Sequence, residues 1–149
     1  MKDPFKIVKY PANILATKCE EIDERVLDFS KLRFRFQRAC NRSNGVAVAA
    51  PQLGIPYQFF YYDYQGERFM ALNPEIHERS EEMVTGVEAC LSVPGREFRV
   101  PRHEWIVWSC DLDGKETIRE RVSGWKARII QHECDHLAGI CLPDRFPEA

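Results

Sequence analysis

Two stretches of this chain carry the residue pattern of an α-helix. In Leu27–Arg42 the apolar positions form one stripe and the arginines fall mostly on the other side, with Asp28 or Ser30 as a suitable N-cap. A second helix is predicted over Arg121–Gly139, which ends on a glycine, the residue type typical of helix stops.

Runs of aromatic and β-branched residues between these two helices predict strands. Tyr57–Tyr64 and Arg68–Leu72 are separated by a short link that contains glycine, which predicts an antiparallel hairpin closed by Asn73-Pro74. Ile76–Thr85 is polar and only partly alternating, so we expect it at the edge of a sheet.

Further strands are predicted over Phe98–Arg102, Trp105–Asp111 and Thr117–Val122, with a tight turn at Asp113-Gly114. This order predicts an α+β fold, with short antiparallel sheets around the C-terminal helix and one N-terminal helix. The 149 residues suffice for one core and contain no repeat or linker, so we expect residues 1–149 to form a single domain.

Charge and composition narrow the classes of function. The formal net charge is −2, so no overall field would draw DNA or an anionic membrane to the protein. No apolar run approaches the roughly 18 residues that a membrane span needs, and residues 1–10 do not resemble a secretory signal. None of the six cysteines forms a C-x-x-C pair, and we expect a reducing, cytoplasmic location.

One glutamine stands in an unexpectedly apolar place. Gly45–Pro56 is made of small and apolar residues, and its two prolines exclude a long helix. Gln52 lies within it, and burying an amide is costly unless a partner uses it. Two interpretations stay open: Gln52 bonds to the backbone, or its amide serves a site.

Candidate metal chemistry is concentrated near the C-terminus. His132 and His136 are four residues apart, which on a helix puts both imidazoles on one face. Such a pair can bind a divalent metal, with Glu133 as general base for an attacking water. Two histidines and a glutamate on a solvated helix face would be equally consistent with this motif alone.

The identity of the third metal ligand distinguishes zinc peptidases from other metal-dependent proteins. A catalytic metal usually has three protein ligands and one open position. Two kinds of zinc peptidase are disfavoured, because few residues follow His136 and Leu142 stands where a third histidine would lie. Cys90 could supply a thiolate, which with two imidazoles suits zinc or ferrous iron. A structural site would need a fourth ligand, and we find only three convincing candidates.

Three motifs then occur in one order along the chain. They are Gly45-Val46-Ala47-Val48-Ala49-Ala50-Pro51-Gln52, Glu88-Ala89-Cys90-Leu91-Ser92 and His132-Glu133-Cys134-Asp135-His136. Together they resemble the G-x-G-x-A-A-x-Q, E-G-C-x-S and H-E-x-x-H motifs of the peptide deformylase family. The resemblance extends over nearly the whole chain, from about Ile7 to Arg145.

The resemblance implies metal-dependent hydrolysis that removes the formyl group from N-formylmethionyl peptides and nascent proteins and releases formate. It implies metal ligands at Cys90, His132 and His136, and so makes the C-terminal helix a metal-binding helix. The cation would be Fe²⁺ in the cell, with Zn²⁺, Ni²⁺ or Co²⁺ as alternatives. Glu133 would move the proton, while the Gln52 amide and the Leu91 N–H would stabilise charge on the formyl oxygen.

The same resemblance suggests where the substrate lies. Gly45 would let the substrate backbone approach, and Trp125, Arg128 and Ile129 would line the methionine pocket. The family is apolar there, so Arg128 is a departure. We expect it to fold over the pocket with its head on an acid or a substrate carbonyl, or else to point to solvent.

Other expectations concern partners and departures from the family motifs. A monomer in transient contact with the ribosome is expected. Glu88 is expected to pair with Arg102, although a surface pair of little value is the alternative. Ala47 and Ala89 replace glycines and would disturb their loops if the backbone there needs positive φ. The tail after Leu142 holds two prolines and cannot form the long C-terminal helix of bacterial members, which suggests a short form such as phages encode.

Overall fold

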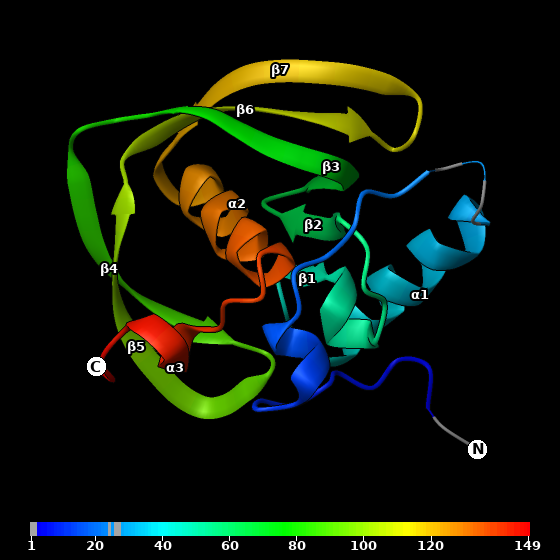
Figure 1. The fold of residues 1–149 in the computed structure, drawn as a ribbon, viewed down its shortest axis with the longest axis horizontal. Coiled ribbons are helices and arrows are strands. Elements are labelled where there is room, and N and C mark those ends of the chain that lie inside the picture. Colours follow the sequence, from blue (N-terminus) through cyan, green and yellow to red (C-terminus); the bar gives the residue numbers. More distant parts are fainter. Residues whose placement is uncertain (1–2, 24, 26–27) are drawn as a thin grey trace.

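Two antiparallel sheets surround one helix in the computed structural model, which describes residues 3–23, 25 and 28–149 (Figure 1). The larger sheet has the strand order β1-β2-β3-β6-β7, and the smaller sheet pairs β4 with β5. The strands are β1 (Ala47–Ala49), β2 (Phe59–Tyr64), β3 (Glu67–Arg79), β4 (Met83–Cys90), β5 (Val93–His103), β6 (Trp105–Leu112) and β7 (Glu116–Ser123). The helices are α1 (Phe29–Arg42), α2 (Gly124–Leu137) and the short α3 (Leu142–Arg145), with 3₁₀ turns over Asn13–Ala16 and Ala50–Leu53.

Helix α1 confirms the first predicted helix. The side chain of Asp28 caps it by accepting a hydrogen bond from the Lys31 backbone N–H at 3.2 Å. Its apolar stripe is buried against β2, where the rings of Phe36 and Phe59 lie 5.1 Å apart. The predicted start at Leu27 lies outside the described residues.

The β2–β3 hairpin was predicted correctly, but its end was not. Gln65 and Gly66 form the turn with φ of 51° and 81°, as a tight two-residue hairpin turn requires. Asn73-Pro74 does not close β3, which continues to Arg79 through a register shift between Leu72 and Glu75. The Asn73 side chain bonds both the N–H and the C=O of Ile22, so a contact distant in sequence holds this irregularity in place.

Strand lengths also depart from the expected short sheets. β3 has 13 residues and β5 has 11, because each continues through positions that the residue pattern assigned to turns or edges. Residues 121–123 complete β7 in register with β6, so α2 begins at Gly124 and not at Arg121. The Asp113-Gly114 turn between β6 and β7 was predicted correctly, with φ of 53° and 67°.

The strands β1 and β2 of the larger sheet are buried on both faces. Along β2, Phe60 and Tyr62 pack with Ala127 and Ile130 of α2, whereas the alternate residues Phe59 and Tyr61 pack in the cluster that covers α1. Because successive side chains of a strand point to opposite faces, this explains an unbroken aromatic run in the sequence. Helix α2 therefore lies between the larger sheet and the β4–β5 pair (Figure 1).

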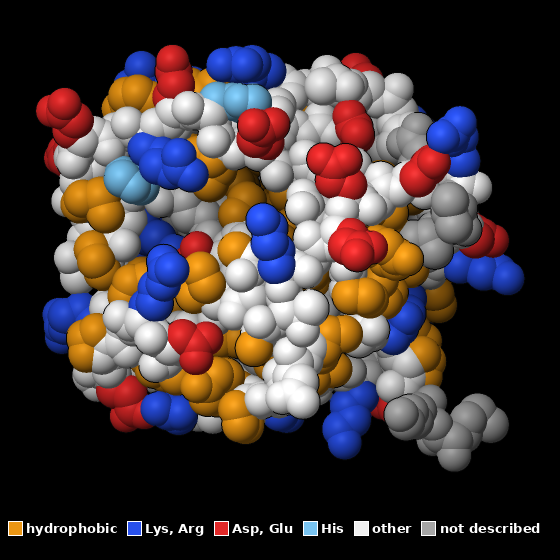
Figure 2. All heavy atoms as spheres, viewed as in Figure 1, with side chains coloured by type: hydrophobic (Ala, Val, Ile, Leu, Met, Phe, Trp, Pro, Cys, Tyr) orange, Lys and Arg blue, Asp and Glu red, His pale blue; other side chains and the backbone are white. Residues whose placement is uncertain are grey.

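The remaining features of the fold are its surface charges, the character of its helices and the path of its last residues. Acidic and basic side chains are interspersed over the face shown in Figure 2. In the described part of the chain no helix has the length and apolar character of a membrane span. After α3 the chain is extended and its backbone is hydrogen-bonded to β5. The Arg99 N–H donates to Pro147 O, and the Ala149 N–H donates to Glu97 O.

Gly139 fixes the end of α2 against the N-terminal segment. Gly139 has φ +82°, and the backbone N–H of Ile140 donates to Asp135 O at 2.9 Å. This is the hydrogen-bond pattern of a helix that ends at a glycine. A Cβ at this position would lie 2.8 Å from the backbone oxygen of Ala16.

Replacing Gly139 by alanine is therefore expected to lower the free energy of unfolding, measured by urea denaturation. Gly66→Ala is the matched control, because Gly66 has φ +81° and no atom within 4 Å of the added Cβ. The control should cost ~1 kcal/mol for the left-handed backbone, and Gly139→Ala about 1–3 kcal/mol more for the steric conflict. Equal losses would show that the contact with Ala16 is relaxed without cost.

Candidate active site

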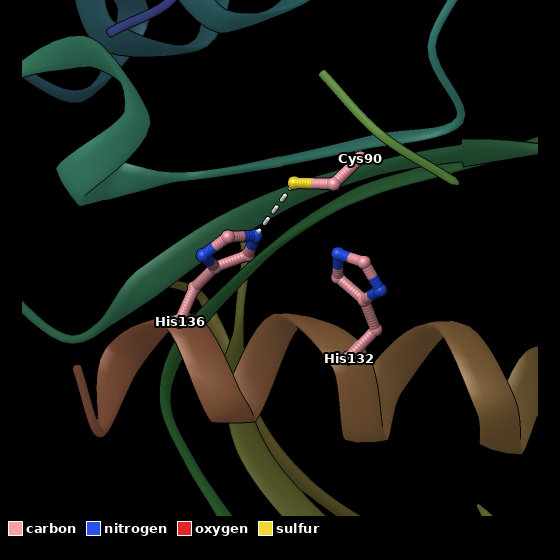
Figure 3. A group of neighbouring side chains, drawn as sticks. All are labelled: Cys90, His132 and His136. Carbon is pink, nitrogen blue, oxygen red and sulfur yellow. Dashed lines mark hydrogen bonds between the residues drawn. The ribbon is translucent and has the colours of Figure 1, made fainter. Parts of the chain in front are cut away.

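Three potential metal ligands meet between α2 and the end of β4. His132 and His136 lie one helical turn apart on α2, with ring centroids 5.0 Å apart. The Cys90 sulfur lies 3.3 Å from His136 Nε2, and one ligand atom from each of the three residues falls within 4.8 Å of the others (Figure 3). The prediction that a cysteine far away in sequence approaches the histidine pair is confirmed.

The donor set has the chemistry of a catalytic metal site. His132 Nδ1 is bonded to Glu88 Oε1 at 2.8 Å, and His136 Nδ1 faces the sulfur of Cys141 at 3.8 Å. This leaves the Nε2 atoms directed towards Cys90, as the orientation of ligating histidines requires. Among the described residues no fourth His, Cys, Asp or Glu joins this group, so a cation held there would keep a position for a non-protein ligand.

Glu133 provides a carboxylate with a free oxygen beside this group. It is buried, its Oε2 lies 4.0 Å from His132 Nε2, and burial raises its pKa to about 7. In the described part of the chain, Glu133 Oε1 is the buried side-chain oxygen or nitrogen that lacks a partner. A buried acceptor without a partner is costly, which favours a role in proton transfer over a structural one.

Gln52 bonds to the backbone, as one of the two interpretations expected, and its other end lies beside Cys90. Its Oε1 accepts a hydrogen bond from the Ala49 backbone at 2.9 Å, while its Nε2 donates to Ser92 Oγ at 3.1 Å and lies 3.7 Å from the Cys90 sulfur. The amide is therefore oriented at its oxygen end and presented to the site at its nitrogen end. Ser92 was not predicted as a site residue, although its place in the second motif was a signal that could have identified it.

Leu91 and Gly45 lie next to each other in the wall of the same cavity. In the described part of the chain, the Leu91 N–H has no hydrogen-bond acceptor, and its carbonyl accepts from Lys9 Nζ at 3.1 Å. A Cβ on Gly45 would lie 2.7 Å from Leu91 Cδ1, so glycine makes room there for the leucine side chain. That Gly45 also admits a substrate backbone stays a prediction.

The predicted Glu88–Arg102 pair is confirmed and is buried. Arg102 donates two hydrogen bonds to Glu88 at 3.0 and 2.9 Å and a third to Asp135 at 2.6 Å. Burial alone would raise the pKa of Glu88, but hydrogen bonds from His132 and Arg102 lower it to about 2. With exposures of 7% and 5% for the two side chains, the alternative of a surface pair is wrong.

Arg128 is buried, which contradicts the alternative that it points to solvent. Only 7% of it is exposed, and its guanidinium donates to Glu88 Oε2 at 2.6 Å, so its head has found an acid. The predicted pocket residues Trp125, Arg128 and Ile129 line one cavity of about 770 Å³. Glu133 and Gln52, which lie beside the potential metal ligands, line the same cavity. Trp125 is exposed at the rim, while Ile129 is buried.

The two alanines that replace motif glycines do not disturb the backbone. Ala47 lies in β1 and Ala89 in β4, and neither has positive φ. The loops therefore need no adjustment at these positions. All six cysteines are free thiols, and Cys134 packs against the core on the side of α2 away from the ligands.

Comparison with known proteins agrees with this geometry. The polypeptide deformylase family model matches residues 4–149. A peptide deformylase of Dictyoglomus thermophilum is 42% identical over 134 residues, which covers 89% of this chain and 84% of that protein. The peptide deformylase of Thermodesulfovibrio yellowstonii is 39% identical over 148 residues, which covers 95% and 88%.

Solved structures give the same result. The peptide deformylase of Thermotoga maritima superposes with a TM-score of 0.87 at 30% identity and covers 95% of this chain and 96% of its own. The actinonin-bound class I type b peptide deformylase of Acinetobacter baumannii has a TM-score of 0.88 at 31% identity, with 95% and 97% covered. Since the family model spans almost the whole sequence and the relatives are matched over most of their length, the chain belongs to the peptide deformylase family.

Proposed function

We propose that Cys90, His132 and His136 hold one divalent cation on helix α2, and that residues 1–149 work as one catalytic domain around it. As a member of its family, the chain removes the formyl group from formylated nascent peptides. The observation that carries the site assignment is the approach of three ligand atoms to within 4.8 Å beside a glutamate with an unpartnered oxygen. A bound cation would supply Lewis acidity that activates water and polarises the formyl carbonyl.

Glu133 is the proton carrier in this proposal. A water oxygen bonds to the formyl carbon while Glu133 Oε1 accepts one of its protons. The carbon–nitrogen bond then breaks, Glu133 returns the proton to the leaving amine, and formate departs. Burial supports this role, because a pKa near 7 lets the carboxyl group both accept and donate a proton at neutral pH.

Gln52 and Leu91 would stabilise the charge that develops on the formyl oxygen. The Gln52 amide is oriented by Ala49 and Ser92, and the N–H that lies 3.7 Å from the Cys90 sulfur would be the one that donates to the formyl oxygen. The uncommitted Leu91 N–H would be the second donor. Glu88 and Arg102 would act indirectly: Glu88 bonds to His132 and fixes the orientation of its ring, and Arg102 holds Glu88 in place.

The substrate and cation are proposed in finer detail from the resemblance. N-formylmethionyl chains would place the methionine side chain against Trp125, Arg128 and Ile129, with Gly45 beside the substrate backbone. Fe²⁺ would be the cation in the cell, and Zn²⁺, Ni²⁺ or Co²⁺ would be accepted by the same ligands. We further propose a cytoplasmic monomer that meets nascent chains in transient contact with the ribosome.

Glu133→Gln should lower kcat for formate release from formyl-Met-Ala-Ser by a factor of about 10²–10⁴, because the proton carrier is lost while the side-chain shape is kept. The metal content, measured by elemental analysis after anaerobic purification, should not change. Glu97→Gln, at an exposed position of β5, is the control. A loss of less than about tenfold in Glu133→Gln would assign the base to another group.

Cys90→Ser should lower metal occupancy by at least about tenfold, because a hydroxyl group is a poor substitute for a thiolate ligand. Cys134→Ser is the matched control, since Cys134 lies within the same motif yet packs on the core. Its metal content should stay close to that of the wild type. Equal occupancy in the two variants would contradict the ligand assignment.

Gln52→Leu should lower kcat by a factor of about 10²–10³, the usual cost of removing an oxyanion donor. Ser92→Ala removes only the group that orients the amide and should cost about tenfold or less. Formate release and metal content should be measured for both. A loss of less than about tenfold in Gln52→Leu, with unchanged metal content, would contradict the role of Gln52 as an oxyanion donor.

A further inference from the structure

Arg128 and Gly86 form one structural unit in the wall of the cavity. Gly86 lies on β4, and a Cβ built on it would meet Arg128 Cζ at 3.0 Å, Nη2 at 3.2 Å and Nε at 3.3 Å. Because Cζ is the nearest of the three atoms, the guanidinium lies flat over the glycine. A side chain at Gly86 would force the guanidinium to shift, by a few tenths of an ångström for a single Cβ and by more for a larger residue, so the two residue types depend on each other.

The guanidinium is held rigidly by three of its five N–H groups. Nη1 donates to Glu88 Oε2 at 2.6 Å and to Val100 O at 2.9 Å, and Nη2 donates to Val84 O at 2.6 Å. These acceptors belong to β4 and β5, so the arginine spans from α2 to the smaller sheet. Its charge is compensated by Glu88, which also accepts from Arg102 and His132.

Two N–H groups of Arg128 remain uncommitted. In the described part of the chain, the Nε–H and the second Nη2–H have no acceptor. Among the described residues, Glu133 Oε1 is the buried side-chain nitrogen or oxygen that has no hydrogen-bond partner. Arg128 Nε also has no partner but is not buried in this sense, so solvent reaches it. Arg128 lines the cavity, and its Cζ lies 5.7 Å from the centre of the Trp125 ring in the same wall, so the cavity is the side on which the Nε–H can meet a ligand.

We propose that Arg128, supported by Gly86, is a specificity-determining residue that favours a first substrate side chain ending in a hydrogen-bond acceptor. This rests on the proposed function, which puts that side chain against Arg128. The thioether of methionine is a weak acceptor, the oxygen of methionine sulfoxide is a strong one, and the hydrocarbon norleucine offers none. The pocket therefore takes formylated peptides whose methionine has been oxidised, as a further class of substrate.

The physical reason is the cost of an unmade hydrogen bond to a fixed charge. A hydrocarbon side chain would cover the Nε–H and replace its water without offering an acceptor. A sulfoxide oxygen would replace that water directly. Sites built to donate a hydrogen bond reject analogues that lack the acceptor far more strongly than apolar pockets distinguish similar shapes.

The test compares formyl-methionine-sulfoxide-Ala-Ser with formyl-norleucine-Ala-Ser. The wild-type chain should have a kcat/KM at least about tenfold higher for the sulfoxide, the usual worth of a hydrogen bond to a charged donor. Arg128→Met, which keeps the length of the side chain and removes the donors, should lose this preference. The ratio within one variant cancels any general loss of activity from a weakened Glu88–His132 contact.

Two further variants sharpen the result. Gly86→Ala keeps the charge but forces the guanidinium to shift by a few tenths of an ångström, so it should lower the sulfoxide preference by less than Arg128→Met does. Arg99→Met removes an exposed arginine of β5 and should leave the preference unchanged. A wild-type preference for norleucine, or the same ratio in wild type and Arg128→Met, would overturn the proposal.

Product binding separates this proposal from the proposed function. Calorimetry with the unformylated peptides methionine-sulfoxide-Ala-Ser and norleucine-Ala-Ser needs no catalysis. Tighter binding of the sulfoxide by wild type, lost in Arg128→Met, supports the inference even if no formate is released from any formyl peptide. Absence of formate from formyl-Met-Ala-Ser would count against the proposed function alone, and equal binding of the two products would count against the inference.

Discussion

The buried carboxylate of Glu88 is the interaction on which the site depends. It accepts two hydrogen bonds from Arg102, one from Arg128 and one from His132, so a single residue of β4 joins the smaller sheet to helix α2. Removing one partner of such a buried group typically costs about 3–5 kcal/mol, because a charge is left uncompensated. The same contacts fix the ring of His132, so the packing of the domain and the geometry of the candidate metal site rest on one carboxylate.

Around this fully bonded centre, a few groups stay without a partner. Glu133 Oε1 is buried and unbonded, and in the described part of the chain neither the Leu91 N–H nor the Arg128 Nε–H has an acceptor. All three belong to residues that line one cavity. Polar groups in folded proteins are almost always bonded to protein or to water, so a cluster of groups without a protein partner marks the surface where a ligand completes the bonding.

Errors in the predicted fold have a common physical cause. Asn73-Pro74 has the pattern of a strand end, yet β3 runs on because the Asn73 amide bonds to Ile22 and supports a bulge. Residues 121–123 precede a helical motif, yet they stay extended because their partners on β6 are in register. In both places a tertiary contact outweighed the local preference, whereas the turns at Gly66 and Gly114 needed only their own backbone freedom.

The sequence by itself determined the spacing of His132 and His136, the availability of Cys90 and the α+β class, because these follow from helical periodicity, ligand chemistry and the order of the elements. Only the tertiary structure decided that Arg128 turns inward, that Gly86 makes room for it and that Ser92 orients Gln52. Each of these depends on which backbone lies opposite a side chain, and that information arises only when β4, β5 and α2 pack together.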